Sequence, residues 1–370
     1  MLAIKFYGLG NIAMLLPVLQ AVHDSLPEIE IDFLTLQENR SLLERSGLVR
    51  NVLTADLTTL HGFVGGLWRA LRQARARRYD LVADFEQFIK LSAIFSYCTG
   101  APDRIGFNTD GQHRAWLYNV RVVYTDSEHM SGIFKRILRP LQIPLASRPV
   151  RMAVVPEEER RIDSLLDENG ISADRFPLIA VHVGSGPNFY HVPLKRWPVQ
   201  NFARLCDALI ERYGATIVLT GKGAEERALV AETKAAMKAT PVDLCDRVSV
   251  EDLMVLLRRC HLTVANDTSV MHLAALVGTP VVAFFGPTLP IHYGPGNAHD
   301  LVFYRDLYCS PCLTNYNLKV SRCTDPVCIR TISVEEVFDG IEKRFLAEDA
   351  PLRPHLKARA PDPAGSLAAS

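Results

Sequence analysis

Net charge is the first thing that this sequence lacks. Lysine plus arginine and aspartate plus glutamate number 41 each among the 370 residues. No global field therefore draws the protein toward nucleic acid or toward a membrane surface, although a local patch can still do so. We expect no nucleic-acid partner. The length exceeds one ordinary hydrophobic core and predicts two domains.

Long apolar runs are missing as well. No stretch approaches the roughly 18 consecutive apolar residues that are needed to cross a bilayer. Residues 6–22 superficially resemble a signal peptide, but Gly8, Gly10, Asn11 and Pro17 interrupt them and no clean cleavage pattern follows. A short strand, a tight glycine turn and a helix from about Asn11 account for the same residues. We therefore expect a cytoplasmic protein.

A complete dinucleotide fingerprint is also absent. The first glycine turn, with Gly8 and Gly10, lacks the third glycine, and no acidic residue ends the second expected strand at residues 34–36. Both features are typical of dinucleotide-binding domains. A dehydrogenase is therefore not expected.

Short β-type runs alternate with amphipathic helical stretches through most of the chain. This alternation predicts βαβ units, with parallel sheets and helices on both faces. The expected strands are residues 3–6, 29–34, 49–53, 81–85, 178–183, 216–220, 262–265 and 281–285. The expected helices include residues 157–169, 199–213, 224–237 and 250–258.

Each half of the chain opens with a strand that runs into a glycine turn, which contains Gly184 and Gly186 in the second half. The predicted fold class is therefore α/β, with two doubly wound Rossmann-like domains, residues 1–174 and 175–347, facing each other across a cleft. Ligands are expected at the carboxyl ends of the strands. A capping-box helix is expected at residues 333–346, and the Pro- and Ala-rich residues 348–370 are expected to form a disordered tail.

Three loops of the second half follow expected strands, at residues 184–198, 221–226 and 266–269. In the third loop, Thr268 and Ser269 offer hydroxyl and backbone N–H groups at the start of a helix that contains His272, and such a helix start binds anions readily. Asp267 ends the strand before it. Simple helix capping is the alternative, but three loops at one sheet edge favour a phosphate site within residues 264–272.

Lys195 and Glu225 lie in the other two loops. A flexible ammonium beside a glycine turn suits the compensation of a diphosphate, and a carboxylate at a helix start can accept hydrogen bonds from ribose hydroxyls. The alternatives are a solvated surface lysine and a carboxylate that complements the helix dipole.

These loops resemble those of glycosyltransferase family 9, the heptosyltransferase family of lipopolysaccharide core assembly. The resemblance covers roughly residues 1–345 and is carried by residues 195–198, 221–225, 266–275, 278–280 and 285–288. It implies a GT-B fold and an inverting transfer from a nucleotide-diphospho-sugar, ADP-heptose in characterised members, to a lipid-linked saccharide. It also implies that the chemistry needs no cofactor, and it is consistent with peripheral contact at the inner face of the inner membrane.

Two family motifs hold the donor, Lys-x-Trp and Asp-Thr-Gly. By resemblance these roles carry over to Lys195, Asp267 and Thr268. Ser269 replaces the usual glycine of the second motif, keeps its N–H group and adds a hydroxyl. Phosphate binding is therefore expected to survive.

The first glycine turn departs from the family pattern. The family has a Gly-Asp pair whose Asp is the catalytic base, whereas this chain has Gly10 and Asn11, and an amide cannot accept a proton at neutral pH. Three interpretations remain open. The base is Asp84 or Glu86 at the end of another strand; or Asn11 only orients the acceptor while phosphate or solvent takes the proton; or the protein catalyses poorly. For Asp84, a strand-terminal helix cap is a further alternative.

A basic helix is expected near residues 68–79. It carries Arg69, Arg72, Arg75, Arg77 and Arg78. Such a run is often a solvated face, but it also fits contact with anionic lipid head groups or with a phosphorylated acceptor.

Eight cysteines occur without a secretory signal, and four of them are clustered. The clustered cysteines, spaced C-x2-C-x10-C-x4-C, are Cys309, Cys312, Cys323 and Cys328. This spacing suits a structural thiolate site for zinc or iron, and four free thiols on an irregular loop are the alternative. The other four cysteines are expected to be reduced core residues.

Two further function classes compete with glycosyl transfer. A nucleotide-sugar epimerase on the same two-domain plan would need acidic residues on both sides of the sugar. A nucleotide-sugar-binding protein with weak or no catalysis is motivated by Asn11.

Overall fold

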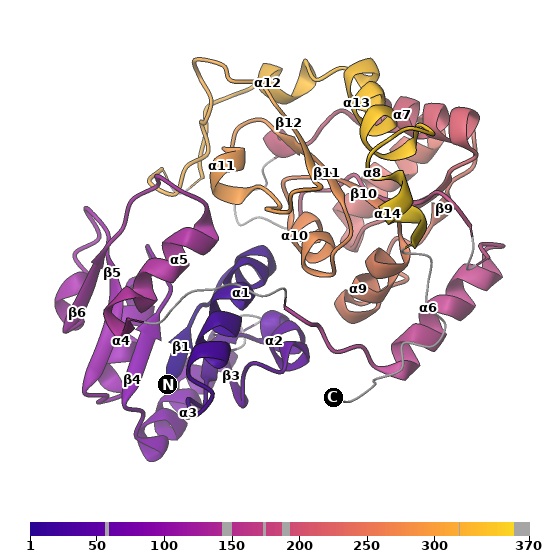
Figure 1. The fold of residues 1–370 in the computed structure, drawn as a ribbon. Coiled ribbons are helices and arrows are strands. Elements are labelled where there is room, and N and C mark those ends of the chain that lie inside the picture. The colour runs from indigo at the N-terminus through magenta and orange to yellow at the C-terminus, as the bar shows by residue number, and fades with distance from the viewer. Residues whose placement is uncertain (56–58, 143–149, 173–174, 187–192, 318, 359–370) are drawn as a thin grey trace. The chain divides into compact units, whose positions relative to one another are not determined.

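The computed structural model describes residues 1–55, 59–142, 150–172, 175–186, 193–317 and 319–358. The chain forms two compact units, Met1–Ala153 and Val154–Ser370, which are coloured indigo to magenta and magenta to yellow in Figure 1. No helix among the described residues is long and apolar enough to cross a membrane.

The first unit is built on a six-stranded parallel sheet in the order β3-β2-β1-β4-β5-β6. Its strands are β1 (Leu2–Ile4), β2 (Asp32–Leu36), β3 (Asn51–Ala55), β4 (Leu81–Asp84), β5 (Asp103–Asn108) and β6 (Val120–Val123). The strand order reverses between β1 and β4. In doubly wound sheets, ligands bind beyond the carboxyl ends of the strands at this switch point.

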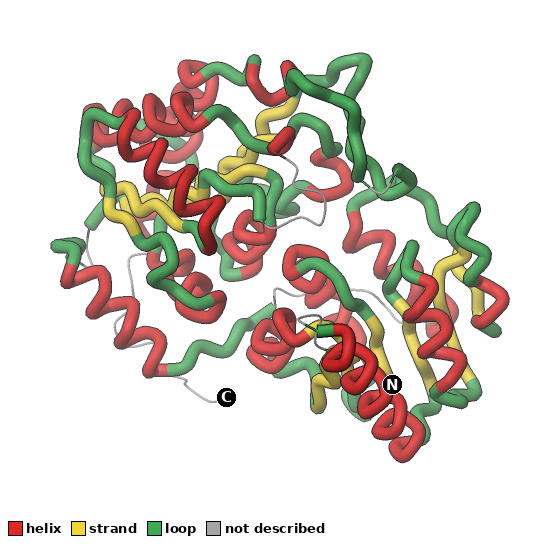
Figure 2. Tube along the Cα trace, turned by 180° about the vertical axis from the view of Figure 1, so that it is seen from behind, coloured by secondary structure: helices red, strands yellow, loops and turns green. Residues whose placement is uncertain are grey.

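Helices cover both faces of this sheet (Figure 2). They are α1 (Leu9–Ser25), α2 (Arg40–Ser46), α3 (Leu60–Arg77), α4 (Lys90–Cys98) and α5 (Met130–Leu138), with short turns η1 (Gln37–Asn39), η2 (Ala115–Leu117) and η3 (Arg139–Leu141). Ala70 and Ala74 of α3 and Phe95 of α4 pack on Leu2, Ile4 and other buried strand residues. Gly66 of α3 lies so close to β3 that a Cβ there would be 3.1 Å from the Cα of Ala55.

The second unit repeats this topology with a parallel sheet in the order β12-β11-β10-β7-β8-β9. Its strands are β7 (Leu178–His182), β8 (Thr216–Thr220), β9 (Val242–Asp243), β10 (Leu262–Asn266), β11 (Val281–Phe285) and β12 (Leu301–Tyr304). The order reverses between β7 and β10. Apart from the edge strands β9 and β12 and Thr216 at the start of β8, every strand residue is buried, as expected for a parallel sheet that is covered on both faces.

Helices also cover both faces of the second sheet (Figure 2). They are α6 (Pro156–Glu168), α7 (Val199–Tyr213), α8 (Gly223–Ala236), α9 (Val250–Arg259), α10 (Ser269–Leu276), α11 (Pro290–Tyr293), α12 (Val327–Arg330), α13 (Val334–Ile341) and α14 (Arg353–Ala358), with the short turn η4 (Pro193–Lys195) and the π-helix η5 (Glu342–Leu346). The core includes the fully buried Trp197, which stacks on Phe284 at 4.3 Å between ring centroids.

All eight expected strands are present. Their carboxyl ends differ from the expected positions by at most two residues and their amino ends by at most three. Four further strands, β5, β6, β9 and β12, were not expected from the sequence. β5 begins with charged residues, β9 has two residues, and the exposure of β6 alternates as it does on a half-covered edge.

Two parts of the expected domain organisation differ in the structure. Helix α6, which the sequence placed in the first domain, lies in the second unit, where Arg161 and Asp163 form ion pairs with Asp252 and Arg259 of α9. The expected tail from residue 348 is wrong as far as residue 358, because α14 buries Leu356 completely in the core of the second unit. The tail residues 359–370 lie outside the described residues, and so does residue 174 at the expected domain limit.

Candidate functional site

The switch point of the second sheet is held together by Asn266, the last residue of β10. Its amide nitrogen donates to the carbonyl oxygens of Val183 and Gly184, at 3.0 and 2.9 Å, just after β7. Its amide oxygen accepts a hydrogen bond from the backbone nitrogen of Trp197 at 2.9 Å. One buried side chain therefore fixes the loop after β7 and the segment that carries Lys195.

Trp197 is the anchor that brings Lys195 into the protein. Its indole is fully buried, and its ring nitrogen donates to the carbonyl oxygen of Ile332 at 2.9 Å. Lys195, two residues earlier, is consequently only 7% exposed. The alternative of a solvated surface lysine does not describe this geometry.

Lys195 meets Asp267 at the end of β10. The Lys195 ammonium donates to Asp267 Oδ2 at 2.6 Å, and the Thr288 hydroxyl donates to the same oxygen at 2.7 Å. Burial by itself would raise the pKa of Asp267, but the charge and hydrogen bond of Lys195, aided by Lys319 and Thr288, hold it below its usual value. The site therefore contains a buried, ionised Lys–Asp pair.

Helix α10 begins directly after this pair. Thr268 is its N-cap, and the Thr268 hydroxyl accepts a hydrogen bond from the backbone nitrogen of Val270 at 3.1 Å. The capping role that the sequence allowed is thus present. Ser269 opens the helix partly exposed, and His272 is buried one turn later. The first N–H groups of a helix have no partner within the helix and carry its positive dipole end, so this position can receive an anion.

Glu226 joins the two glycine turns of the second unit. Its carboxylate accepts hydrogen bonds from the backbone nitrogens of Gly186 and Lys222, at 3.0 and 2.9 Å, and lies 3.4 Å from His182 Nε2. Burial would raise the pKa of Glu226, but the hydrogen bond and charge of His182, together with the two backbone bonds, lower it to about 2. Glu226 is therefore a charged crosslink between the loops after β7 and β8.

The position of Glu226 explains why the turn after β7 contains glycines. A Cβ on Gly184 would lie 2.1 Å from Glu226 Oε1, and Gly186 has a φ of +73°, which side chains rarely adopt. Glu225, the residue selected from the sequence, instead lies near the surface, where it accepts a hydrogen bond from Arg196 Nη2 at 2.7 Å. Arg196 in turn donates to Ser185 at 3.0 Å. The rest of this loop, residues 187–192, lies outside the described residues.

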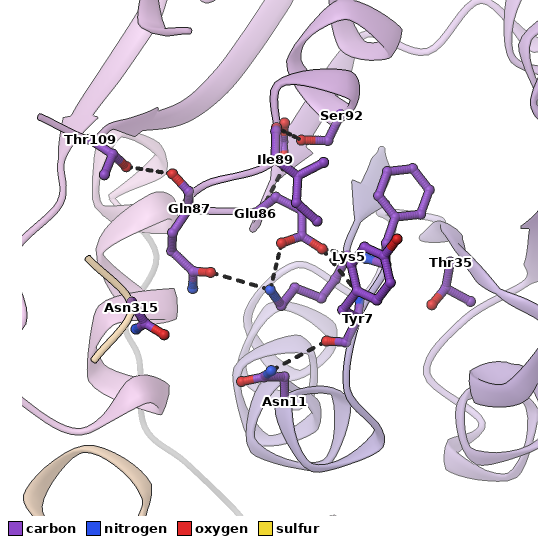
Figure 3. Close-up of polar contacts among 12 residues, drawn as sticks. Lys5, Tyr7, Asn11, Thr35, Glu86, Gln87, Ile89, Ser92, Thr109 and Asn315 are labelled. Atoms are coloured by element: carbon purple, nitrogen blue, oxygen red, sulfur yellow. Dashed lines mark hydrogen bonds and ion pairs between the residues drawn. The ribbon is translucent and has the colours of Figure 1, made fainter. Parts of the chain in front are cut away.

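In the first unit, Glu86 lies at the switch point between β1 and β4 and, like Glu226, accepts hydrogen bonds from backbone nitrogens of a neighbouring turn (Figure 3). One oxygen accepts hydrogen bonds from the backbone nitrogens of Phe6 and Tyr7, at 2.6 and 3.3 Å, and the other accepts from the Lys5 ammonium at 2.8 Å. Glu86 is 3% exposed. These bonds fix the turn that leads into α1.

Asp84 is fully buried inside the first unit. Oδ2 accepts hydrogen bonds from Arg114 at 2.6 Å and from Tyr118 at 2.5 Å, and Oδ1 accepts from the backbone nitrogen of Glu86 at 2.9 Å. The side chain has no exposed surface, and burial raises its pKa despite the charge of Arg114. The helix cap that the sequence offered as an alternative for Asp84 is not what the structure shows, since α4 begins at Lys90 with Ile89 as its N-cap; Asp84 instead forms a buried ion pair with Arg114.

Asn11 lies in the first turn of α1 and is partly exposed. Its amide nitrogen donates to the carbonyl oxygen of Tyr7 at 3.3 Å, and Figure 3 shows the amide oxygen on the side away from this carbonyl. The turn needs Gly8, with a φ of +87°, because a Cβ there would lie 2.8 Å from the Asn11 amide nitrogen. Gly10 is buried within α1.

The four clustered cysteines are all free thiols. Among the described residues, no group of three or more His, Cys, Asp or Glu side chains is arranged to hold a metal ion. The expected zinc or iron site therefore has no support in this structure. Burial, and then the neighbouring Cys312, Cys309 and Cys323, raise the pKa of Cys328 to about 11.

Sequence reasoning missed several residues of these networks. Glu226 is adjacent to the chosen Glu225, and Asn266 and Thr288 lie inside the motifs at residues 266–275 and 285–288. A helix period would have placed either Glu225 or Glu226 inward, so the choice between them needed the position of the other loop. His182 and Lys319 carry no signal in a single sequence.

Residues 66–320 match Glycosyltransferase family 9 (heptosyltransferase). Lipopolysaccharide heptosyltransferase 2 of Escherichia coli K12 is 26% identical over 289 residues, which cover 76% of this chain and 81% of that protein.

Solved structures show the same architecture. A glycosyl transferase family 9 protein from Veillonella parvula superposes with a TM-score of 0.78 at 21% identity, over 92% of this chain and 95% of the other. The E. coli ADP-heptose LPS heptosyltransferase II superposes with a TM-score of 0.71 at 21% identity, over 92% and 97%. The expected GT-B fold, with two parallel-sheet α/β units, is confirmed. The chain belongs to glycosyltransferase family 9 and is a glycosyltransferase.

Proposed function

We propose that this enzyme transfers a heptose, with inversion at the anomeric carbon, from ADP-heptose to a saccharide acceptor of the lipopolysaccharide core. The donor is supported by family membership and by the structural similarity to the E. coli ADP-heptose LPS heptosyltransferase II. The acceptor is supported by the lipopolysaccharide heptosyltransferase relatives. The observation that carries the proposal is the buried Lys195–Asp267–Thr288 cluster at the start of α10.

The donor diphosphate is proposed to lie at the N-terminus of α10. As the bond to the anomeric carbon breaks, negative charge develops on the departing nucleoside diphosphate, and the helix N–H groups and Lys195 stabilise it there. Asp267 holds the Lys195 ammonium in place through a 2.6 Å hydrogen bond. Glu225, held by Arg196, is proposed to accept hydrogen bonds from the ribose hydroxyls.

Asn11 is proposed to orient the acceptor hydroxyl, whose proton passes to an acceptor phosphate or to solvent. Asp84 has no exposed surface, and both of its oxygens are hydrogen-bonded within the first unit. Glu86 is also buried and accepts hydrogen bonds from Lys5, Phe6 and Tyr7. These contacts favour positioning roles for both carboxylates.

The role of Glu86 can be tested with Glu86→Gln. The amide still accepts hydrogen bonds from the two backbone N–H groups, and Gln87→Glu, which moves a carboxylate to the neighbouring position, serves as the matched control. We expect the pH profile of kcat to keep its acidic limb. If kcat instead falls about 100-fold or more and the acidic limb of the pH profile disappears, Glu86 is the base.

A second candidate function is nucleotide-sugar binding with weak catalysis, and Asn11 is the observation that favours it. One experiment separates the two. The protein is incubated with ADP-heptose and other nucleotide sugars, with and without a truncated core acceptor, and nucleoside diphosphate release is followed. Acceptor-dependent release supports transfer, and NMR of the product anomer tests inversion. Binding without release supports the second candidate, and an epimerised sugar formed without acceptor would support an epimerase.

The proposal also includes a peripheral contact with the inner face of the inner membrane. Helix α3 supports it, since Arg69 and Arg72 are exposed on the same helix as Trp68, whose exposed fraction is 61%. The helix contains no acidic residue.

A further inference from the structure

The loop after β4 carries a buried side-chain amide whose nitrogen is unpaired. Gln87 follows β4 by three residues and is 6% exposed. Its backbone is fixed, because the Thr109 hydroxyl donates to the Gln87 carbonyl oxygen at 2.6 Å. No group among the described residues accepts a hydrogen bond from Gln87 Nε2, although this atom is buried. Buried polar side-chain atoms mostly have a partner, so this nitrogen calls for a physical reason.

The Lys5 ammonium decides which way this amide faces. It donates to Gln87 Oε1 at 3.3 Å and to Glu86 Oε2 at 2.8 Å. An ammonium can only donate, so the amide oxygen has to face Lys5 and the amide nitrogen has to face away from it, as Figure 3 shows. Exchanging the two amide atoms would set donor against donor. The unpaired position of Gln87 is therefore a hydrogen-bond donor.

This donor belongs to the same network as Asn11. A continuous series of hydrogen bonds joins Gln87 to Lys5, Lys5 to Glu86, Glu86 to the backbone nitrogen of Tyr7, and the Tyr7 carbonyl oxygen to Asn11 Nδ2. The network lies at the carboxyl ends of β1 and β4, between which the strand order reverses. Ligands of doubly wound sheets bind at this position. The unpaired donor is thus placed where a ligand is expected.

The charges of this network restrict the kind of group that Gln87 can bind. Lys5 and Glu86 form an ion pair at 2.8 Å in which both side chains are 3% exposed. Arg114, the neighbouring buried cation, forms an ion pair with Asp84. Two ion pairs offer no surplus positive charge to a phosphate or a carboxylate, and the Glu86 carboxylate would repel such a group. A neutral amide donor beside them suits the oxygen of an uncharged hydroxyl group.

We propose that Gln87 binds the saccharide acceptor, with its amide nitrogen donating a hydrogen bond to a hydroxyl oxygen of the acceptor sugar. This inference rests on the proposed function and adds a residue that selects the acceptor to the Asn11 amide that orients the reacting hydroxyl. The acceptor oxygen supplies the partner that the buried N–H group lacks. A sugar without this hydroxyl would leave the N–H group unpaired in the complex, which is how polar sites reject such analogues.

The test measures the affinity of the ADP-loaded protein for a truncated core saccharide by calorimetry, so that no turnover is needed. Gln87→Glu keeps the side-chain length and an oxygen for Lys5 but removes the N–H donor, and Gln87→Met removes the donor without adding charge. We expect both variants to bind the saccharide about 3- to 10-fold more weakly, as for the loss of one hydrogen bond, and to bind ADP as the wild-type chain does. Gln73→Glu makes the same change at an exposed position of α3 and is the matched control.

Monodeoxy analogues of the truncated saccharide identify the hydroxyl. The wild-type chain should bind one of these analogues about 3- to 10-fold more weakly than the parent saccharide. Gln87→Met should bind that analogue and the parent equally well, because the two changes delete the same hydrogen bond and are therefore not additive. Additive losses for every analogue would contradict a bond between Gln87 and an acceptor hydroxyl.

Each other outcome overturns a defined statement. Unchanged saccharide affinity in both Gln87 variants overturns the role of Gln87 and leaves the proposed function standing. A loss in Gln87→Met alone would assign the effect to the Lys5 contact and overturn the donor role of the amide. Weaker binding of ADP as well as of the saccharide, with a lowered Tm, would mean that Gln87 only supports the loop. If the wild-type chain binds ADP but not the saccharide, the proposed function itself fails.

Discussion

At the scale of single residues, the two sheets use one polar side chain each at their switch points. Glu86 ties β4 to the turn after β1, and Asn266 ties β10 to the loop after β7. Both are buried, and both bond backbone groups that no strand can satisfy at that position. Such residues fix the turn that leads into α1, where Asn11 lies, and the segment that carries Lys195, and they touch no ligand in the proposed mechanism.

Asn11 gives the sharpest prediction at this scale. If Asn11 occupies the position of a base, Asn11→Asp should raise kcat about 100-fold or more, the usual contribution of a general base. The carboxylate loses the amide's hydrogen bond to the Tyr7 carbonyl oxygen and becomes freer to meet the acceptor. The measurement is kcat with saturating acceptor, and Asn11→Ala is the control. Equal turnover in the Asp and Ala variants would contradict the base position.

The sequence selected much of the candidate site because each chosen residue belongs to a motif after an expected strand. Lys195, Asp267 and Thr268 lie where that reasoning placed them, beside one another at the start of α10. Glu226 was missed, since neighbouring carboxylates on a helix start look alike until the opposing loop is in place. Asp84 carried a strand-end signal that the structure explains by a buried bond to Arg114.

At the scale of elements, the loops after β7 and β8 depend on the charge of Glu226. Its folded pKa of about 2 lies below the ordinary value of 4.5, so the unfolded chain binds the proton more tightly. The charged form therefore stabilises the fold above about pH 4.5, and this contribution, about 3 kcal/mol, is lost as the pH falls toward 2.

Glu226→Gln tests this stabilisation. The variant should have a lower Tm at pH 7 and a shallower fall in Tm between pH 5 and pH 3, because the group that takes up a proton on unfolding is gone. Glu232→Gln, on the exposed side of the same helix, is the control. Parallel Tm–pH curves for wild type and Glu226→Gln would contradict the assigned role.

Helix α3 is the element for which we predict membrane binding. The paired substitution Arg69→Gln/Arg72→Gln should weaken binding to vesicles rich in anionic lipid by about 2 kcal/mol, roughly 30-fold, at about 1 kcal/mol per basic residue. Trp68→Ala should weaken it further by removing an exposed aromatic ring. Co-sedimentation with vesicles measures the binding.

Two controls apply to the membrane prediction. Binding must fall as salt rises from 0.1 M to 1 M, because the screening length shrinks from about 10 Å to about 3 Å. Lys238→Gln/Lys343→Gln removes two exposed lysines of the second unit and should have no effect. Salt-independent binding would contradict an electrostatic contact.

At the scale of the whole molecule, the two units share a topology but differ in the chemistry at their switch points. In the second unit Lys195 pairs with Asp267 at the start of α10, and Glu226 joins two glycine turns. In the first unit Lys5 pairs with Glu86, and Asn11 lies at the start of α1. Donor contacts are therefore expected from the second unit.

This division predicts where nucleotide binding stabilises the chain. ADP at 100 times its Kd should stabilise the state that binds it by about 2.7 kcal/mol. In native-state hydrogen exchange, this protection should appear in β7, β10 and α10 and be absent from β1, β4 and α4. AMP at the same multiple of its own Kd is the control for occupancy. Equal protection in both units would contradict a donor site built from the second unit alone.

The sequence by itself determined the parallel α/β architecture, the family and the position of the motif around Asp267. Strand runs, glycine turns and the residues around Asp267 are local signals, and propensity and periodicity act within a few residues of each position. Only the tertiary structure decided which carboxylates are buried and paired, that α6 and α14 pack within the second unit, and that Cys312 and Leu313 bond through their backbone nitrogens to the carbonyl oxygen of Pro287. These outcomes depend on segments tens of residues apart, whose burial and charge balance are set by packing and are not encoded in any one window of the chain.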